Sequence, residues 1–277
     1  MKHLLKLLLM LPVFSVLSGC AHSGQYNNSI GRILFVGNSL TYYNDVPAMV
    51  GEIYSVISEH HSIETDMLAQ GGLSIEQHLS NDVLKSTLAV SDYDVVVLQD
   101  FGGWPLCSTD IDSCSSTSDP LSDAIDLVRS SGARPIWFST YQRIPDFQRA
   151  LSKEAHRIAL QLDVEIADVG GAMLAFSSAN DMTDILLPNH HPNILGSWIA
   201  AATIARSLSG KPLPKTLVLD SICRQIWQGS GLTADQPASA QQSTKEECDG
   251  LALDVLQKVV AAANKSFNTD ASDAGAG

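Results

Sequence analysis

The chain has 277 residues, of which 45% are hydrophobic and 17% are charged, and its formal net charge is −13. This length and composition allow one sizeable α/β core and do not require two domains. The negative charge argues against nucleic-acid binding, because such binding needs Lys and Arg to displace counterions from phosphates. We therefore expect a globular domain that does not bind nucleic acid.

The amino terminus has the layout of a secretory signal. Two lysines accompany an apolar run at 4–16, which is too short for a comfortable membrane span. The next residues, Leu17-Ser18-Gly19-Cys20, resemble the lipobox of bacterial lipoproteins, although an ordinary signal with an incidental cysteine remains the alternative. The resemblance implies a signal peptide at 1–19, lipidation of Cys20, and a polar tether at 20–31. Ala21 in place of Asp implies a lipid-anchored protein of the outer membrane, facing the periplasm or the cell surface.

Four further cysteines follow: Cys107, Cys114, Cys223 and Cys248. An even number of cysteines in an exported chain suggests two disulfides. Three connectivities are possible, and the simplest pairs Cys107 with Cys114 and Cys223 with Cys248. A metal site is not expected, because no CxxC or His-rich spacing accompanies these cysteines.

From residue 32 onward, apolar runs bounded by turn residues alternate with helical periodicity. This alternation predicts a parallel five-stranded sheet with helices on both faces, a three-layer α/β/α sandwich in one domain over 32–267. The run at 94–98 is continuous enough for a central strand. We expect strands at 32–36, 63–68, 94–98, 134–140 and 164–168, and helices from 46 and at 75–89, 120–131, 145–162, 170–176, 193–208 and 251–267.

The remaining segments are expected to lack regular structure. Residues 38–45 read as a loop after the first strand. Residues 209–250 are rich in Pro, Ser, Gln and Gly and read as a loop with a short helix near 217–228. The composition of 268–277 predicts a disordered tail.

Candidate chemical groups follow the first three strands. Ser39 comes directly after the first strand, Gly71-Gly72 after the second and Gln99 after the third. Because the carboxyl ends of parallel strands share one edge of a sheet, these groups should converge. Ester hydrolysis needs a nucleophile, a base and donors for the oxyanion. Ser39 could be the nucleophile and a late histidine such as His191 the base. The oxyanion donors could be the N–H groups of Ser39 and Gly72 with the Gln99 amide. Alternatively, Ser39 could serve only the backbone of its turn.

The ordered set of motifs resembles a known superfamily. Gly37-Asn38-Ser39-Leu40-Thr41 is similar to the first block of the SGNH hydrolases, the GDSL-type esterases and lipases. Gly72-Leu73-Ser74 resembles the second block, and His191-Pro192 the last. The resemblance covers 32–208 and implies a flavodoxin-like fold and serine-esterase chemistry without cofactor or metal. It implies that Ser39 is the nucleophile, that His191 is the general base, and that the N–H groups of Ser39 and Gly72 line the oxyanion hole.

The sequence departs from the superfamily pattern in two places. The third block usually carries an Asn, where this chain has Gln99 before Asp100, so Gln99 is either a substitute oxyanion donor or a loop residue. The acid usually found three residues before the histidine is replaced by Pro188. The orienting group for His191 could then be Asp184, Asn189, Asp100 or a backbone carbonyl, or the site could work as a Ser–His dyad.

The other histidines have simpler interpretations. His190 adjoins His191, but the following Pro192 favours His191 as the base. We expect His78 to be a half-buried packing or surface residue and His156 to be solvated on a helix face.

These observations predict an esterase for O-acetyl or other short acyl groups, which could act on cell-envelope or environmental glycans. A lipase acting on longer acyl chains is a second option. The rival class is a non-catalytic envelope binding protein, for which Pro188 is the best support.

Overall fold

The computed structural model describes residues 30–58, 63–106, 119–177, 182–215, 217, 222–226, 245–249 and 253–272. The expected signal peptide, Cys20, most of the tether, Cys107 and Cys114 lie outside these residues. Within the described part, no helix is both long enough and apolar enough to cross a membrane.

Five parallel strands form the central sheet in the order β2-β1-β3-β4-β5. Val36 of β1 lies beside Leu68 of β2 and Leu98 of β3, so these three strands end at the same level. In this strand order the chain continues from β1 to β2 on one side and from β3 to β4 on the other, so the boundary between β1 and β3 is a topological switch point. The strands are β1 (Arg32–Gly37), β2 (Glu64–Ala69), β3 (Val95–Gln99), β4 (Arg134–Ser139) and β5 (Glu165–Asp168), each close to its predicted position.

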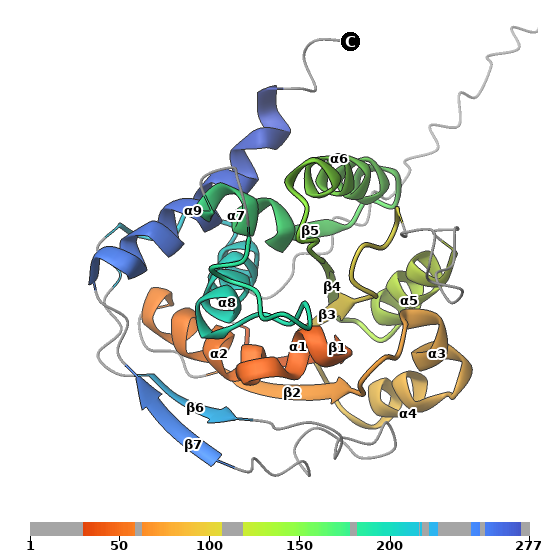
Figure 1. Ribbon diagram of the computed structural model, residues 1–277. Coiled ribbons are helices and arrows are strands. Elements are labelled where there is room, and N and C mark those ends of the chain that lie inside the picture. Colours follow the sequence, from red (N-terminus) through yellow and green to blue (C-terminus); the bar gives the residue numbers. More distant parts are fainter. Residues whose placement is uncertain are drawn as a thin grey trace, which may run out of the picture.

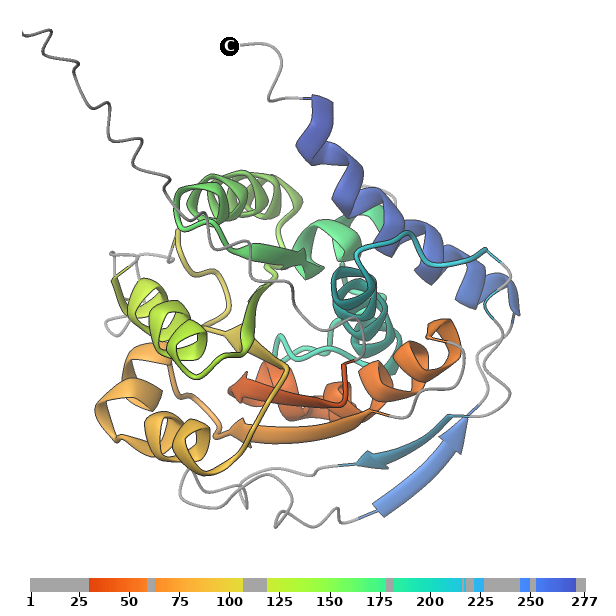
Figure 2. The same ribbon diagram turned by 180° about the vertical axis from the view of Figure 1, so that it is seen from behind.

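Helices cover both faces of the sheet, which confirms the predicted α/β/α sandwich (Figure 1). Phe35 and Val97 belong to the core on one face, and Val36 and Leu98 to the core on the other, because successive strand residues point to opposite sides. Figure 2 shows the same layers from behind. The first face is covered by α2 (Val46–Ile57), α7 (Val169–Phe176), α8 (Ile194–Ser209) and α9 (Leu253–Ser272), and the second by α3 (Ile75–Ser80), α4 (Val83–Val90), α5 (Asp119–Ser130) and α6 (Pro145–Gln161).

The first half of the chain differs from prediction at two places. The predicted loop at 38–45 is helical, with α1 (Ser39–Tyr42) followed by a 3-10 turn, η1 (Tyr43–Asp45). The predicted helix at 75–89 is two helices, because Asp82 adopts a left-handed conformation (φ 57°) between α3 and α4. A single helix cannot continue through such a residue.

The carboxyl-terminal part differs more. Residues 222–226, expected in a short helix, form β6 (Ile222–Ile226), which pairs antiparallel with β7 (Lys245–Asp249). Its partner is distant in sequence, so no local pattern reveals it. The register sets Cys223 directly opposite Cys248, where backbones are close enough for a disulfide, and this pairing stays a prediction. Helix α9 continues to Ser272, so the prediction of a disordered tail is wrong over 268–272.

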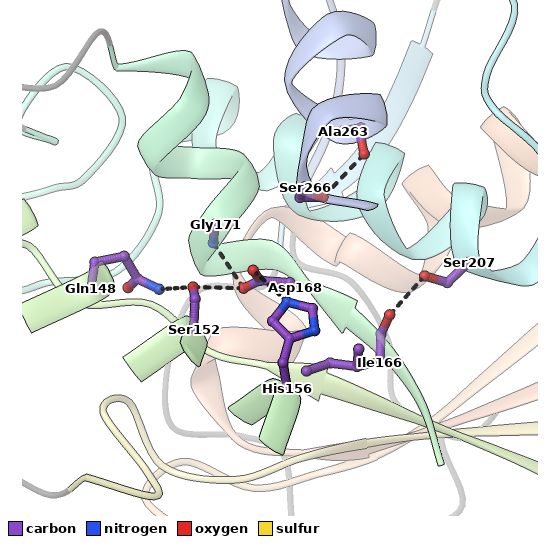
Figure 3. Close-up of polar contacts among 9 residues, drawn as sticks. All are labelled: Gln148, Ser152, His156, Ile166, Asp168, Gly171, Ser207, Ala263 and Ser266. Carbon is purple, nitrogen blue, oxygen red and sulfur yellow. Dashed lines mark hydrogen bonds and ion pairs between the residues drawn. The ribbon is translucent and has the colours of Figure 1, made fainter. Parts of the chain in front are cut away.

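A buried carboxylate fixes the corner where β5, α6 and α7 meet (Figure 3). Asp168 ends β5 and accepts hydrogen bonds from the Gly171 N–H at 2.9 Å and the Ser152 hydroxyl at 3.0 Å. His156 Nε2 lies 3.1 Å from the same carboxylate. The expectation that His156 is solvated is therefore wrong. The helical pattern could not reveal this contact, because the partner carboxylate lies at the end of a strand.

Candidate active site

A cleft of about 350 Å³ opens at the carboxyl edge of the sheet, at the switch point between β1 and β3. Segments that follow β1, β2, β3 and β4 line it together with the loop before α8. Ser39, Gly72 and His191 all line this cleft, so residues that are far apart in sequence meet there. Gln99, Asp100 and Asp184 are not part of its lining.

The turn that carries Ser39 is specified residue by residue. A Cβ on Gly37 would lie 2.4 Å from Gln99 Oε1 and 2.5 Å from Thr41 Oγ1, so a larger residue there would displace these two hydrogen-bonded side chains. The Asn38 side chain caps α1 by accepting the Leu40 N–H at 3.1 Å. Ser39 is then the first residue of α1 and is placed at the cleft by the capped helix start.

Gln99 supports the Ser39 turn and is not part of the cleft lining. It is fully buried, and its Oε1 accepts the Asn38 N–H at 2.9 Å and the Thr41 hydroxyl at 2.7 Å. Its Nε2 donates to Asn38 Oδ1 at 3.1 Å and to the Asp100 carbonyl. Because the amide is used within the Ser39 turn, these contacts favour the loop role over the alternative of an oxyanion donor.

The backbone N–H of Gly72 remains a candidate hydrogen-bond donor to the oxyanion. Gly72 has φ +76°, a conformation that favours glycine, and it lines the cleft. A capping box follows, in which the Ser74 hydroxyl accepts the Gln77 N–H at 3.2 Å and Gln77 Oε1 accepts the Ser74 N–H at 2.9 Å. Asn38 Nδ2 donates to the Leu73 carbonyl at 3.0 Å, which ties this segment to the Ser39 turn.

His78 is a supporting residue that sequence reasoning missed. It is fully buried, not half-buried or on the surface as expected, and its Nε2 lies 2.8 Å from the Gly37 carbonyl. Burial lowers its pKa, so at neutral pH Nε2 is the protonated nitrogen that donates to Gly37. No local signal reveals this role, because the contact joins α3 to the end of β1.

A compact loop holds His191 before α8. The Leu187 N–H donates to the His191 carbonyl at 2.8 Å, and the Asn193 N–H donates to the Ile185 carbonyl at 3.0 Å. Asn193 also caps α8 through the Gly196 N–H at 3.1 Å. The loop and the first turn of α8 therefore form one hydrogen-bonded unit.

Of the predicted orienting groups, the Asn189 backbone is close enough to the His191 ring to raise its pKa, and none of the predicted side chains is hydrogen-bonded to the ring. Its Nδ1 is buried and has no hydrogen-bond partner among the described residues. Asn189 Oδ1 accepts the backbone N–H of His191 at 3.3 Å, and Asp184 is exposed. Asp100 is buried, and its carboxylate accepts the Phe101 N–H at 2.7 Å. The ring contact of His191 is with Tyr43, which stacks on it with 4.0 Å between centroids.

The electrostatic setting suits His191 as a base. Burial lowers the pKa of His191, the backbone of Asn189 partly opposes this shift, and His190 lowers the pKa further. The imidazole is therefore neutral at pH 7 and can accept a proton. In the described part of the chain Ser39 and His191 are not directly hydrogen-bonded, and Ser39 instead interacts with the Tyr42 hydroxyl. Such contacts are often longer in a free enzyme and tighten when substrate binds.

The fold is that of the SGNH hydrolases. No protein-family model and no curated protein matches the sequence. A putative SGNH hydrolase from Slackia heliotrinireducens is 22% identical with a TM-score of 0.53, over 65% of this chain and 100% of the other. A lipase/acylhydrolase from Enterococcus faecalis is 20% identical with a TM-score of 0.51, over 65% and 96%. A catalytic mutant of an acetylxylan esterase from Geobacillus stearothermophilus is 14% identical with a TM-score of 0.54, over 66% and 96%.

Proposed function

We propose that this protein is a serine hydrolase of short acyl esters, with Ser39 as nucleophile and His191 as general base. The observation that carries the proposal is that Ser39, the Gly72 backbone and His191 line one cleft at the switch point of an SGNH-type fold. Open α/β sheets bind their ligands at this place. The lowered pKa of His191 is consistent with a base that is neutral at physiological pH.

The proposed reaction follows from these positions. Ser39 Oγ attacks the ester carbonyl carbon as His191 takes the hydroxyl proton. The carbonyl oxygen becomes an oxyanion that accepts hydrogen bonds from the N–H groups of Ser39 and Gly72. His191 then gives the proton to the departing alcohol, which leaves an acyl-enzyme on Ser39. Water activated by His191 hydrolyses this ester and restores the serine.

The size of the cleft favours small acyl groups. A volume of about 350 Å³ lies near the lower end for small-molecule sites. Leu40, Phe101 and Leu186 give its walls apolar surface. An acetylxylan esterase is among the proteins of similar fold, which is consistent with an O-acetylated glycan as substrate. A lipase acting on long chains is less well supported by this volume.

The test compares hydrolysis of p-nitrophenyl acetate, butyrate and palmitate. We expect the wild type to cleave acetate and butyrate much faster than palmitate. Ser39→Ala should lose this activity by a factor of about 10³ or more, because the nucleophile is gone. Ser86→Ala, at an exposed position in α4, is the matched control and should retain it. A Ser39→Ala protein as active as the wild type would refute the proposal.

A non-catalytic binding protein is the second candidate, and one observation favours it. Pro188 replaces the usual acid, and His191 Nδ1 has no hydrogen-bond partner in the described part of the chain. Wild type and Ser39→Ala would then be equally inert toward all three esters while both remained folded.

We also propose that the protein is attached to the outer membrane through lipidated Cys20. The support is the Leu-Ser-Gly-Cys sequence after a short apolar run. Metabolic labelling with palmitate should mark the wild type and fail for Cys20→Ser. A wild type that is released freely and stays unlabelled would refute the anchor.

A further inference from the structure

The imidazole of His191 needs an orienting group other than a carboxylate. A general base must keep its ring in one orientation to take a proton from the nucleophile and return it to the leaving group. In the usual arrangement a carboxylate bonded to the second ring nitrogen does this. Here that nitrogen, Nδ1, is buried without a hydrogen-bond partner among the described residues, and Pro188 stands at the position of the acid.

The aromatic ring of Tyr43 is in direct contact with the imidazole. The two ring centroids are 4.0 Å apart and the ring planes differ by 18°, so the rings are stacked face to face. A parallel ring at this distance blocks rotation of the imidazole out of its plane. The negative face of a tyrosine ring also attracts a cation, which favours the imidazolium that forms when His191 takes a proton.

The segment that carries Tyr43 is bonded to the segment that carries His191. Asn44 Nδ2 donates to the Pro192 carbonyl at 3.2 Å and to the Ser197 hydroxyl at 2.9 Å. The Ser197 hydroxyl lies 3.4 Å from the Tyr43 carbonyl, to which it donates. These contacts fix η1 against the start of α8, so the stacked ring and the histidine loop are held as one unit.

The backbone after Tyr43 is held in an uncommon conformation. Asn44 has φ 56° and Asp45 has φ 57°, so two consecutive residues other than glycine are left-handed. Such residues are uncommon and cost free energy that the surrounding contacts must offset. Asp45 Oδ1 accepts the Ala48 N–H at 3.2 Å, which secures the turn into α2. The turn therefore presents Tyr43 to His191 at a conformational cost.

We propose that Tyr43 is the positioning residue of the site, and that its ring holds the His191 imidazole in the orientation that a carboxylate maintains in related folds. The catalytic consequence of this orientation rests on the proposed function, in which His191 is the general base. Tyr43 is not part of the cleft lining, so it acts through His191 and does not touch the substrate. The hydroxyl is not required, because the face of the ring makes the contact.

The kinetic test compares Tyr43→Leu with Tyr43→Phe. We expect Tyr43→Leu to lower kcat for p-nitrophenyl acetate about 10- to 100-fold with KM within about twofold, because transition-state positioning is lost and substrate contacts are kept. Tyr43→Phe retains the stacked ring and should stay within about threefold of the wild type in kcat. If both variants are folded and equally active, or equally impaired, the inference is overturned.

A second measurement separates this inference from the proposed function. In a Ser39→Ala background, NMR of the histidine ring protons reads the His191 environment without any turnover. The stacked ring should shift the His191 signals upfield, and Tyr43→Leu should abolish that shift while Tyr43→Phe preserves it. If the wild type hydrolyses no ester, the proposed function fails, and this spectrum still decides whether Tyr43 stacks on His191 in solution, which is the contact that the inference requires. Unchanged His191 signals in folded Tyr43→Leu would overturn the inference.

Discussion

Gln99, Asn38 and Thr41 form a closed set of hydrogen bonds beneath Ser39. Each bond is buried, and each involves the side chain of a residue near the end of β1 or β3. The asparagine and the threonine of the Gly-Asn-Ser-Leu-Thr motif therefore serve the geometry of the turn, while the serine faces the cleft. The position of Ser39 depends on a glutamine from a neighbouring strand.

Replacing Gln99 by Ala should destabilise the protein. The buried N–H of Asn38 would lose its acceptor, which costs about 1–3 kcal/mol, and the cavity left behind adds to this loss. We expect a decrease of about 2–4 kcal/mol in the free energy of unfolding, measured in urea, together with weaker ester hydrolysis. Gln161→Ala, at the exposed end of α6, should change the free energy by less than about 0.5 kcal/mol. Equal effects of the two variants would contradict the role given to Gln99.

The pH dependence of activity should report the environment of His191. Burial holds the pKa of His191 below its ordinary value of 6.5, and a general base works only in its neutral form. The value of kcat/KM should therefore rise with pH along an acid limb whose apparent pKa lies below 6.5. His190→Gln removes a neighbour that lowers the pKa of His191, so it should shift the acid limb to higher pH. An acid limb above 6.5 in the wild type would contradict this account.

At the level of elements, helix α8 and the loop before it determine where His191 lies. Gly196, in the first turn of α8, passes so close to the loop that a Cβ there would lie 2.4 Å from the Ile185 carbonyl and 3.0 Å from Pro192 Cβ. The same Ile185 carbonyl accepts the Asn193 N–H. Close contact between helix and loop is therefore a condition for the base to reach the cleft.

Gly196→Ala should displace the histidine loop. The added methyl group meets backbone, which cannot move as the end of a flexible side chain can. We expect a loss of about 1–3 kcal/mol in the free energy of unfolding and a decrease in kcat. Gly51→Ala is the matched control, because Gly51 also lies in a helix but its Cβ would come no closer than 3.5 Å to another atom. This control should be neutral or stabilising, since Ala favours helix over Gly. A fully active, equally stable Gly196→Ala protein would contradict the role of this contact.

The sequence predicts elements well where their cause is local. Apolar runs and helical periodicity predict the positions of all five strands of the main sheet. The motifs predict that Ser39, Gly72 and His191 lie close together, and all three line one cleft. Roles set by contacts between distant elements are missed. The partners of Gln99 and His78 and the pairing of β6 with β7 join segments far apart in the chain. The contact of His156 with Asp168 spans only 12 residues, but it joins a helix to the end of the next strand, which helical periodicity does not show.

At the level of the whole molecule, a carboxyl group is buried behind the cleft, and its ionised form costs free energy there. Asp100 is 5% exposed, and burial raises its pKa from 3.8 to about 6 although the N–H groups of Phe101 and Ile75 oppose that shift. The folded protein therefore binds the Asp100 proton more tightly than the unfolded chain does. This contribution to stability is complete at low pH and is lost as pH rises through about 6.

The Asp100→Asn variant should isolate this effect. Between pH 4 and pH 7, the wild type should lose about 2–3 kcal/mol in its free energy of unfolding relative to Asp100→Asn, which carries no titrating group at this position. Urea unfolding across this range measures the difference. The exposed Asp123→Asn should follow the wild-type curve. Parallel curves for wild type and Asp100→Asn would contradict the raised pKa.

The central claim is that Ser39 is a nucleophile activated by His191. A fluorophosphonate probe tests it directly, because the probe forms a covalent bond with an activated serine and needs no knowledge of the natural acyl ester. Mass spectrometry of the digested protein should find the adduct on the peptide that contains Ser39, with no adduct on Ser39→Ala and slow labelling of His191→Ala. A wild type left unlabelled, or labelling that persists at the same rate in Ser39→Ala, would contradict the claim.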